Sequence, residues 1–235
     1  MMHLTRAVLN RNAGVGSIVP LLNPADPNQA LDAHHRLIWT LFPDSEATRD
    51  FLWRSDGSGR FYILSHRKPV QSGLFLTLES TEFSPVLAQG DRLAFTLRAN
   101  ATRDRRMEKC GDGRRRSRRV DLVMDALYSV PGQKTLGPDQ VSDRPRMRMR
   151  IADRVANEWL TAIGDRAGFD IEKLQVDDYS VRQFRRPGGS LVTFGLLDMK
   201  GVLLINQPDP FLAALTSGFG RARAFGCGLM LIRRA

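Results

Sequence analysis

The chain has 235 residues, enough for one large domain or two small ones, and its 35 lysines and arginines outnumber its 25 acidic residues to give a formal charge of +10. This balance favours a polyanionic partner such as nucleic acid over a small acidic substrate, although a basic surface without a partner is the alternative interpretation. The cysteines Cys110 and Cys227 have no CxxC spacing and no nearby histidine, which argues against a disulfide framework and a zinc site. No segment reaches the roughly 18 apolar residues of a membrane span, so we expect a soluble protein of the reducing cytoplasm with no membrane partner.

The first half of the chain alternates strands with one helix. His3–Leu9 predicts a strand, and residues 28–42 predict an amphipathic helix that follows Pro27. β-Branched and aromatic residues between turn residues predict three more strands, at residues 60–67, 73–80 and 92–100. This is the order of a ferredoxin-like βαββαβ unit without a clear second helix, and we expect a first domain over residues 1–98.

Positive charge is concentrated in the middle of the chain. Residues 98–119 hold ten arginines or lysines and three acids, and so carry +7 of the total charge of +10. Like charges at this density oppose folding on their own, so we expect residues 99–145 to be a basic linker or loop that becomes ordered against a polyanion. A solvated charge run without a partner is the alternative.

The second half repeats the pattern of the first. Residues 150–167 predict a helix with one apolar stripe, formed by Ile151, Val155, Trp159 and Ile163. Two strand-like segments, a short helix and a further strand follow, at residues 171–184, 190–206, 209–218 and 227–234. We therefore predict a second domain over residues 146–235 and an α+β fold of two tandem ferredoxin-like, or RRM-like, domains.

A loop near the C-terminus combines bare backbone with positive charge. It contains four glycines and two arginines: Gly218, Gly220, Arg221, Arg223, Gly226 and Gly228. Glycine lets a ligand approach the main chain, and arginine binds phosphate or carboxylate, so this glycine loop predicts an anion site. The GxxxxGK[ST] and GxGxxG fingerprints both fail here, which argues against a bound mononucleotide.

The chain has four histidines, and histidine suits proton transfer because its unperturbed pKa of about 6.5 lies near working pH. His3 and His66 lie in strand-like segments without a motif. On the predicted helix, His34 points into the middle of the apolar arc and His35 lies at its edge. We therefore interpret His34 as a buried structural residue and His35 as accessible; a boundary histidine that caps the core is the alternative for His35. No cluster of carboxylates has the spacing of metal ligands, so we expect no metal site and no cofactor.

Three spaced motifs carry a resemblance to one family. The glycine loop resembles the GhGxxxxxGxG loop, with h apolar, of the repeat-associated RNA-binding proteins of CRISPR systems. HRLIWTLFP at residues 35–43 resembles the HxxLWxLFP helix of the CasE/Cse3 endoribonucleases of type I-E systems, and FTLRAN at residues 95–100 resembles their FxLRANP strand end. Ala101 stands in place of that proline, and Asp32 stands where some members carry a tyrosine one helical turn before the histidine. A residue that assists His35 is therefore not identified.

The resemblance implies two ferredoxin-like domains and metal-independent cleavage of the CRISPR precursor transcript at the base of the repeat hairpin. In such cleavage the 2′-hydroxyl of the RNA attacks the adjacent phosphate and leaves a 2′,3′-cyclic phosphate and a 5′-hydroxyl. The motif alignment selects His35 as the catalytic residue. The implied partners are the CRISPR repeat RNA hairpin and other subunits of a type I-E RNA-guided complex.

The resemblance and the charge pattern together name the candidate RNA contacts. The segment VRQFRRPGGS, at residues 181–190, resembles the family's hairpin that grips the RNA stem, and an ordinary exposed hairpin is the alternative. The other arginines would hold backbone phosphates, which gives affinity rather than sequence choice. The full set is Arg98, Arg114, Arg115, Arg116, Arg118, Arg119, Arg182, Arg185, Arg186, Gly218, Gly220, Arg221, Arg223, Gly226 and Gly228. Two other functions stay open at this point: a non-catalytic RNA-binding subunit of the same kind of complex, and an unrelated RRM-like RNA-binding protein whose charge runs are generic.

Overall fold

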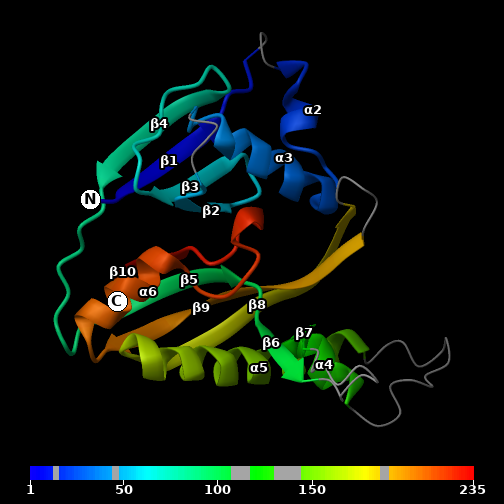
Figure 1. Cartoon of the computed structure of the whole chain (residues 1–235), viewed down its shortest axis with the longest axis vertical. Helices are drawn as coiled ribbons and strands as arrows, with labels where there is room; N and C mark the ends of the chain where they lie inside the picture. The colour runs from blue at the N-terminus through cyan, green and yellow to red at the C-terminus, as the bar shows by residue number, and fades with distance from the viewer. Residues whose placement is uncertain (13–15, 44–47, 107–116, 130–143, 186–190) are drawn as a thin grey trace.

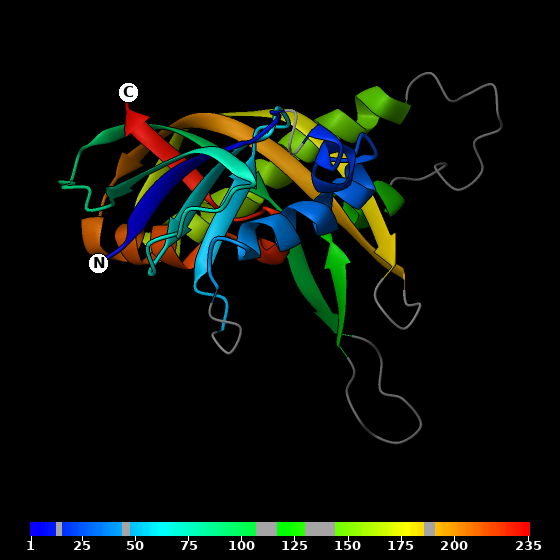
Figure 2. The same cartoon turned by 90° about the horizontal axis from the view of Figure 1, so that it is seen from above.

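The computed structural model describes residues 1–12, 16–43, 48–106, 117–129, 144–185 and 191–235. They form two four-stranded antiparallel sheets and a separate two-stranded ribbon (Figure 1). The two sheets lie one above the other in Figure 1, and both chain ends lie on the same side of the molecule in Figures 1 and 2. Within these ranges, no helix is both long enough and apolar enough to cross a membrane.

The N-terminal domain has one sheet and one main helix. Its strands are β1 (His3–Leu9), β2 (Phe51–Ser55), β3 (Arg60–Ser65) and β4 (Phe75–Glu82), in the order β2-β3-β1-β4. Helix α3 (Pro27–Trp39), which follows the short helix α2 (Val19–Leu22), packs on this sheet. Its buried side chains lie on one face, at Leu31, His34, Leu37 and Ile38. Residues 81–91, where a second helix would follow the predicted strand at residues 73–80, contain no helix, as predicted, and residues 66–74 between β3 and β4 contain none either.

Strand β2 was not predicted from the sequence. Four of its five residues are buried, because the protein covers both of its faces. On one side Trp53 belongs to the core beneath α3, and its indole Nε1–H donates to the backbone oxygen of Ala224 in the glycine loop at 3.2 Å. A strand buried in this way lacks the alternation of apolar and polar residues that identifies strands in a sequence.

The C-terminal domain is a complete βαββαβ unit. Its strands are β5 (Arg92–Ala99), β8 (Phe169–Arg185), β9 (Leu191–Ile205) and β10 (Met230–Arg234), in the order β10-β5-β9-β8. Helices α5 (Arg144–Ala167) and α6 (Pro208–Ser217) pack on the sheet around a core that includes Phe169 and Phe211. The predicted α+β fold of two tandem ferredoxin-like domains is confirmed.

The predicted domain boundary at residue 98 is wrong. Strand β5 was assigned to the first domain, but it lies inside the second sheet, where Leu97 pairs with Met199 of β9 and with Met230 of β10. The chain therefore crosses between the domains after Glu82, which ends β4, and before Arg92, which begins β5. The local pattern of β5 identifies a strand but not its neighbours, because both neighbours are far away in sequence.

Part of the basic region is ordered by its own contacts. The elements are β6 (Thr102–Arg106) and β7 (Ser117–Asp121), which form an antiparallel ribbon, and α4 (Leu122–Tyr128). Asp121 caps α4 by accepting from the backbone N–H of Val123 at 3.0 Å, and it also accepts from the Tyr179 hydroxyl of β8 at 2.9 Å. For these residues the prediction of a loop ordered by a polyanion is wrong. Three of the predicted RNA contacts in this region lie outside the described residues: Arg114, Arg115 and Arg116.

Candidate active site

His34 is a buried structural residue. Its side chain is 6% exposed, and its Nε2 donates to Oδ1 of Asn23 at 2.8 Å. Its ring meets the Phe61 ring edge-on, with 4.9 Å between the ring centroids. Burial, and after it the positive charge of Arg98, lowers the pKa of His34 to about 4. The prediction that His34 is a buried structural residue is therefore confirmed, and its ring is neutral.

His35 lies at the edge of α3 and is half-buried, as its helical position predicts. Its Nε2 accepts a hydrogen bond from Nε1 of Trp39, one turn later, at 3.0 Å. Its ring faces Phe225 of the glycine loop, with 6.1 Å between the ring centroids. Burial first, and then the positive charge of Arg49, lowers the pKa of His35 below its ordinary value, and Asp32 acts in the opposite direction. The ring is therefore neutral at physiological pH and lies where the two domains meet.

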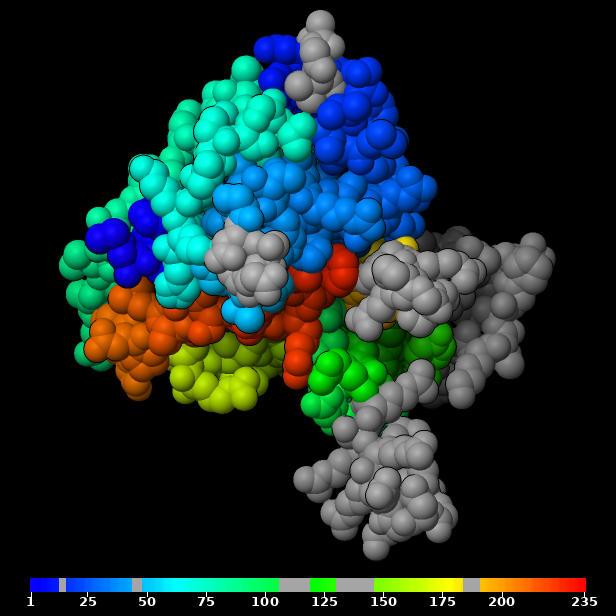
Figure 3. Space-filling view, turned by 45° about the horizontal axis from the view of Figure 1, so that its top comes forward, coloured from blue at the N-terminus to red at the C-terminus, as the bar shows by residue number. Residues whose placement is uncertain are grey.

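The glycine loop runs from the end of α6 to the start of β10, and in Figure 3 this part of the chain, in red, reaches the surface next to the N-terminal domain in blue and cyan. All four glycines have positive φ angles: +80° at Gly218, +79° at Gly220, +76° at Gly226 and +90° at Gly228. A β-carbon on Gly218 would lie 2.8 Å from the side chain of Leu52, and one on Gly226 would lie 3.1 Å from the Trp53 ring. Gly226 and Gly228 are buried. For these two glycines the prediction of a backbone open to a ligand is wrong, because the bare backbone lets the loop pack inside the protein.

Arg223 braces the loop from within. Its Nη2 donates to the backbone oxygen of Gly218 at 2.9 Å, and its Nε donates to that of Gly220 at 3.2 Å. Ala222, the residue before Arg223, adopts a left-handed conformation with φ of +54°, which costs a residue with a β-carbon about 1 kcal/mol. The loop is therefore held in one conformation by a side chain that was predicted to bind phosphate.

Three arginines, Arg49, Arg221 and Arg223, act on one another in sequence, and the first of them also acts on His35. Burial, and after it the positive charge of Arg223, lowers the pKa of Arg49; burial and the charge of Arg221 do the same for Arg223. Arg49 in turn acts on His35. Like charges that depress one another's pKa values in a partly buried site repel, and a bound anion relieves that repulsion. The arrangement favours an anion at Arg49 and Arg223, and Arg49 is the one of the three arginines whose charge acts on His35.

Arg98, a predicted RNA contact of the basic run, is engaged in an ion pair inside the protein. Its Nε and Nη2 donate to the two carboxylate oxygens of Asp198, each at 2.9 Å, and its side chain is 27% exposed. Arg54 of β2 reaches the same carboxylate at 3.4 Å. The cluster links strands of the two domains, so Arg98 serves the domain interface.

The hairpin of β8 and β9 extends to the start of α3, which carries His35 (Figure 1). The backbone N–H of Gln183 donates to Oδ1 of Asn28 at 3.0 Å. Arg182 is half-buried, and Arg185 ends β8. The predicted hairpin is thus present beside the candidate site, and Arg186 lies outside the described residues.

Two further predicted RNA contacts lie on the ribbon formed by β6 and β7. Arg118 and Arg119 belong to β7, and the exposed Arg119 donates from its Nε to Oδ1 of Asp104 at 3.2 Å. Ion pairs at exposed positions are weak. Arg119 can therefore exchange this acid for a phosphate at small cost.

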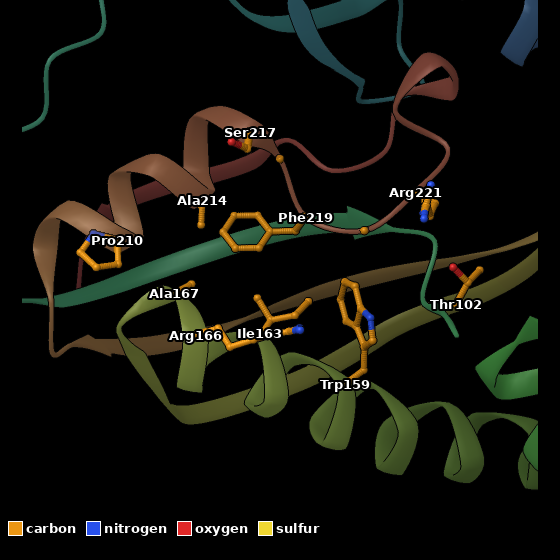
Figure 4. A pocket seen from close by; sticks show the side chains of 12 residues that line it. Thr102, Trp159, Ile163, Arg166, Ala167, Pro210, Ala214, Ser217, Phe219 and Arg221 are labelled. Carbon is orange, nitrogen blue, oxygen red and sulfur yellow. The ribbon is translucent and has the colours of Figure 1, made fainter. Parts of the chain in front are cut away.

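A cavity of about 410 Å³ lies on the other side of the glycine loop, between α5 and α6 (Figure 4). Trp159 of α5 closes it against the loop, since a β-carbon on Gly220 would be 3.1 Å from its ring. Figure 4 shows Arg221 and Thr102 at the same end of the cavity as Trp159. The loop therefore packs against β2 on one side and borders an open cavity with an exposed arginine on the other.

Residues 2–234 match a protein family described as CRISPR associated protein. The chain belongs to this family. Its fold is that of CRISPR-associated protein Cas6e from Escherichia coli str. K-12, with 18% identity and a TM-score of 0.61 over 99% of this chain and 100% of that chain. The same holds for Thermus thermophilus Cse3 bound to an RNA representing a pre-cleavage complex, at 21% identity and a TM-score of 0.61 over 99% and 98% of the two chains. A chain of a CRISPR RNA-guided surveillance complex is 16% identical, with a TM-score of 0.58 over 99% and 100%. No curated protein matches this chain.

In this CRISPR-associated protein the motifs located His35 and the glycine loop, but sequence reasoning missed three of their neighbours. Trp39 lies inside the HRLIWTLFP motif, but its contact with His35 was not predicted, although its spacing of four from His35 places both on one helix face. Arg49 precedes the unpredicted β2, and Phe225 lies inside the loop. Neither has a spacing signal, because their proximity to His35 depends on how the two domains pack.

Proposed function

We propose that this protein binds the hairpin of the CRISPR repeat and cleaves the precursor CRISPR RNA without a metal ion. The 2′-hydroxyl of the RNA attacks the adjacent phosphate, leaving a 2′,3′-cyclic phosphate and a 5′-hydroxyl, and the product stays bound within a cytoplasmic type I-E effector complex. The observation that carries this proposal is the position of His35 where the two domains meet, against Phe225 of the glycine loop and within the field of Arg49, which in turn is acted on by Arg223 of that loop. Family membership supports the choice of CRISPR RNA as the substrate. The fold shared with an RNA-bound Cse3 and with a chain of an RNA-guided surveillance complex supports the same choice.

The residues of the site divide the chemical work. We assign proton transfer to His35, because a lowered pKa keeps its ring neutral and able to accept a proton at physiological pH. Attack on the phosphate adds negative charge, which fixed positive groups stabilise. We assign that role to Arg49 and Arg223, which are half-buried and so less screened by water, and we assign the exposed Arg221 to a backbone phosphate of the RNA.

A non-catalytic RNA-binding subunit is the second candidate, because the glycine loop and its arginines suit RNA binding whether or not a reaction follows. A labelled repeat transcript incubated with the protein in excess EDTA separates the two. The proposed function predicts one cut at the base of the hairpin, with a 2′,3′-cyclic phosphate end. Tight binding without a cut would identify the non-catalytic subunit, and a cut that EDTA abolishes would contradict the metal-independent mechanism.

Replacing Arg182 and Arg186 together by alanine is expected to weaken binding of the repeat hairpin by more than about tenfold at moderate salt. Two lost phosphate contacts also lower the slope of log affinity against log salt by roughly two. The matched control replaces Arg150 and Arg154, which are exposed on α5, and so changes the net charge equally. Equal losses of affinity in the two double variants would mean that general charge, and not the hairpin, binds the RNA.

A further inference from the structure

Trp39 fixes the protonation state of one nitrogen of His35. Its indole N–H is a donor only, and it points at Nε2 of His35 from 3.0 Å. Nε2 must therefore present its lone pair, so the proton of the neutral imidazole is on Nδ1. A second proton on Nε2 would face the indole N–H and break this hydrogen bond.

Trp39 is itself held by a row of aromatic rings. Its ring meets the Phe51 ring edge-on, with 5.1 Å between centroids, and Phe51 stacks on Phe42 at 4.7 Å. The guanidinium of Arg67 lies over the other ring of this stack, 5.3 Å from the centroid of Phe42. The indole N–H therefore has a fixed direction, and the hydrogen bond to His35 does not depend on a mobile side chain.

We propose that Trp39 is a positioning residue that holds His35 as its neutral tautomer, with the proton on Nδ1 and the lone pair on Nε2. The role of Trp39 in catalysis rests on the proposed function, whereas the tautomer of His35 follows from the hydrogen bond alone. The charged groups that act on His35 are Arg49 before β2, and Asp32 and Arg36 on its own helix, while the glycine loop contributes the uncharged Phe225 ring. Replacing Trp39 leaves all of these charges in place, so an effect of the replacement reports the hydrogen bond.

The test is a Trp39→Phe variant, which keeps an aromatic ring against Phe51 and removes the N–H. Titration of the His35 ring by NMR is expected to show a pKa higher by about half a unit to one unit, the size of one lost hydrogen bond. The ¹⁵N shifts of its ring are expected to change from one tautomer to a mixture. The matched control is Trp159→Phe, the same change at a half-buried tryptophan of the other domain, and it is expected to leave the His35 titration unchanged.

Cleavage gives a second readout. If neutral His35 accepts the proton, it does so at Nε2, and the hydrogen bond from Trp39 is given up as the proton arrives. The single-turnover rate then rises with pH through the pKa of His35, and Trp39→Phe is expected to move that rise to higher pH by the same amount, with RNA affinity unchanged. An altered NMR titration in a protein that never cuts RNA would leave the positioning role standing and refute the proposed function. Unchanged titration and tautomer in Trp39→Phe would overturn the positioning role. If the variant fails to fold, ¹⁵N shifts of the unmodified protein still decide, because a proton on Nε2 of His35 overturns the proposal.

Discussion

A repeat RNA with one 2′-deoxy nucleotide immediately upstream of the scissile phosphate is expected to bind with nearly unchanged affinity and not to be cut. The mechanism makes the 2′-hydroxyl the nucleophile, so its removal leaves no group to attack the phosphate. One hydroxyl is a small part of a contact dominated by phosphates, so binding persists. The measurement compares single-turnover cleavage and equilibrium binding of the two RNAs.

The position of the deoxy nucleotide supplies the control. The same substitution one nucleotide farther upstream leaves the attacking hydroxyl in place, and cleavage is expected to continue. Cutting of the first RNA at the normal site would show that water attacks the phosphate. The mechanism proposed for His35 would then be wrong, and a metal-activated water would become the leading alternative.

Replacing His35 by alanine is expected to lower the single-turnover rate by at least about 10²-fold, the typical contribution of general acid–base catalysis. Repeat affinity should change little, because a group that acts in the transition state need not bind the ground state. The neighbouring cations remain in place, so residual cleavage reports what orientation and charge alone contribute. Single-turnover kinetics beside a binding titration separates the two effects.

His34→Ala is the matched control for this experiment, because it removes the same ring one residue earlier on the same helix. It opens a cavity against Phe61 and removes the partner of Asn23, so we expect a loss of about 2–4 kcal/mol in the free energy of unfolding. Cleavage per folded molecule should be largely kept. If His34→Ala folds normally and is inactive while His35→Ala is active, His35 is not the catalytic residue.

The elements that the sequence predicted are those whose pattern is local. Helix α5 shows its apolar stripe over many turns, and α3 shows a face sharp enough to separate His34 from His35. Strand β2 is short and mostly buried, so it has no alternating pattern to detect. The pairing of β5 was also out of reach, because hydrogen bonding between distant segments leaves no mark on the local sequence.

The candidate site shows the same division between local and distant signals. The bond from Trp39 to His35 spans one helical turn, so the sequence contains enough information to predict it. Arg98 appeared to belong to the basic run, but its partner Asp198 lies on β9, a hundred residues later. Likewise, the proximity of Arg49 to Arg223 arises only when the two domains come together. Charge counts located the basic regions of the chain but could not tell which arginines pair inside the protein.

The position of β5 between β9 and β10 affects how the protein is made. During synthesis the N-terminal sheet has all its strands once Glu82 has left the ribosome, and it can begin to fold at that point. Strand β5 follows almost at once but has no neighbours until β9 and β10 appear, and both of its edges stay open to pairing with other chains in the meantime. Its row of buried apolar residues, including Leu93, Phe95 and Leu97, is exposed over the same period. Slow translation of the region between β5 and β9 is therefore expected to favour aggregation of the nascent chain, and a fragment that begins at residue 99 lacks the central strand it needs to fold.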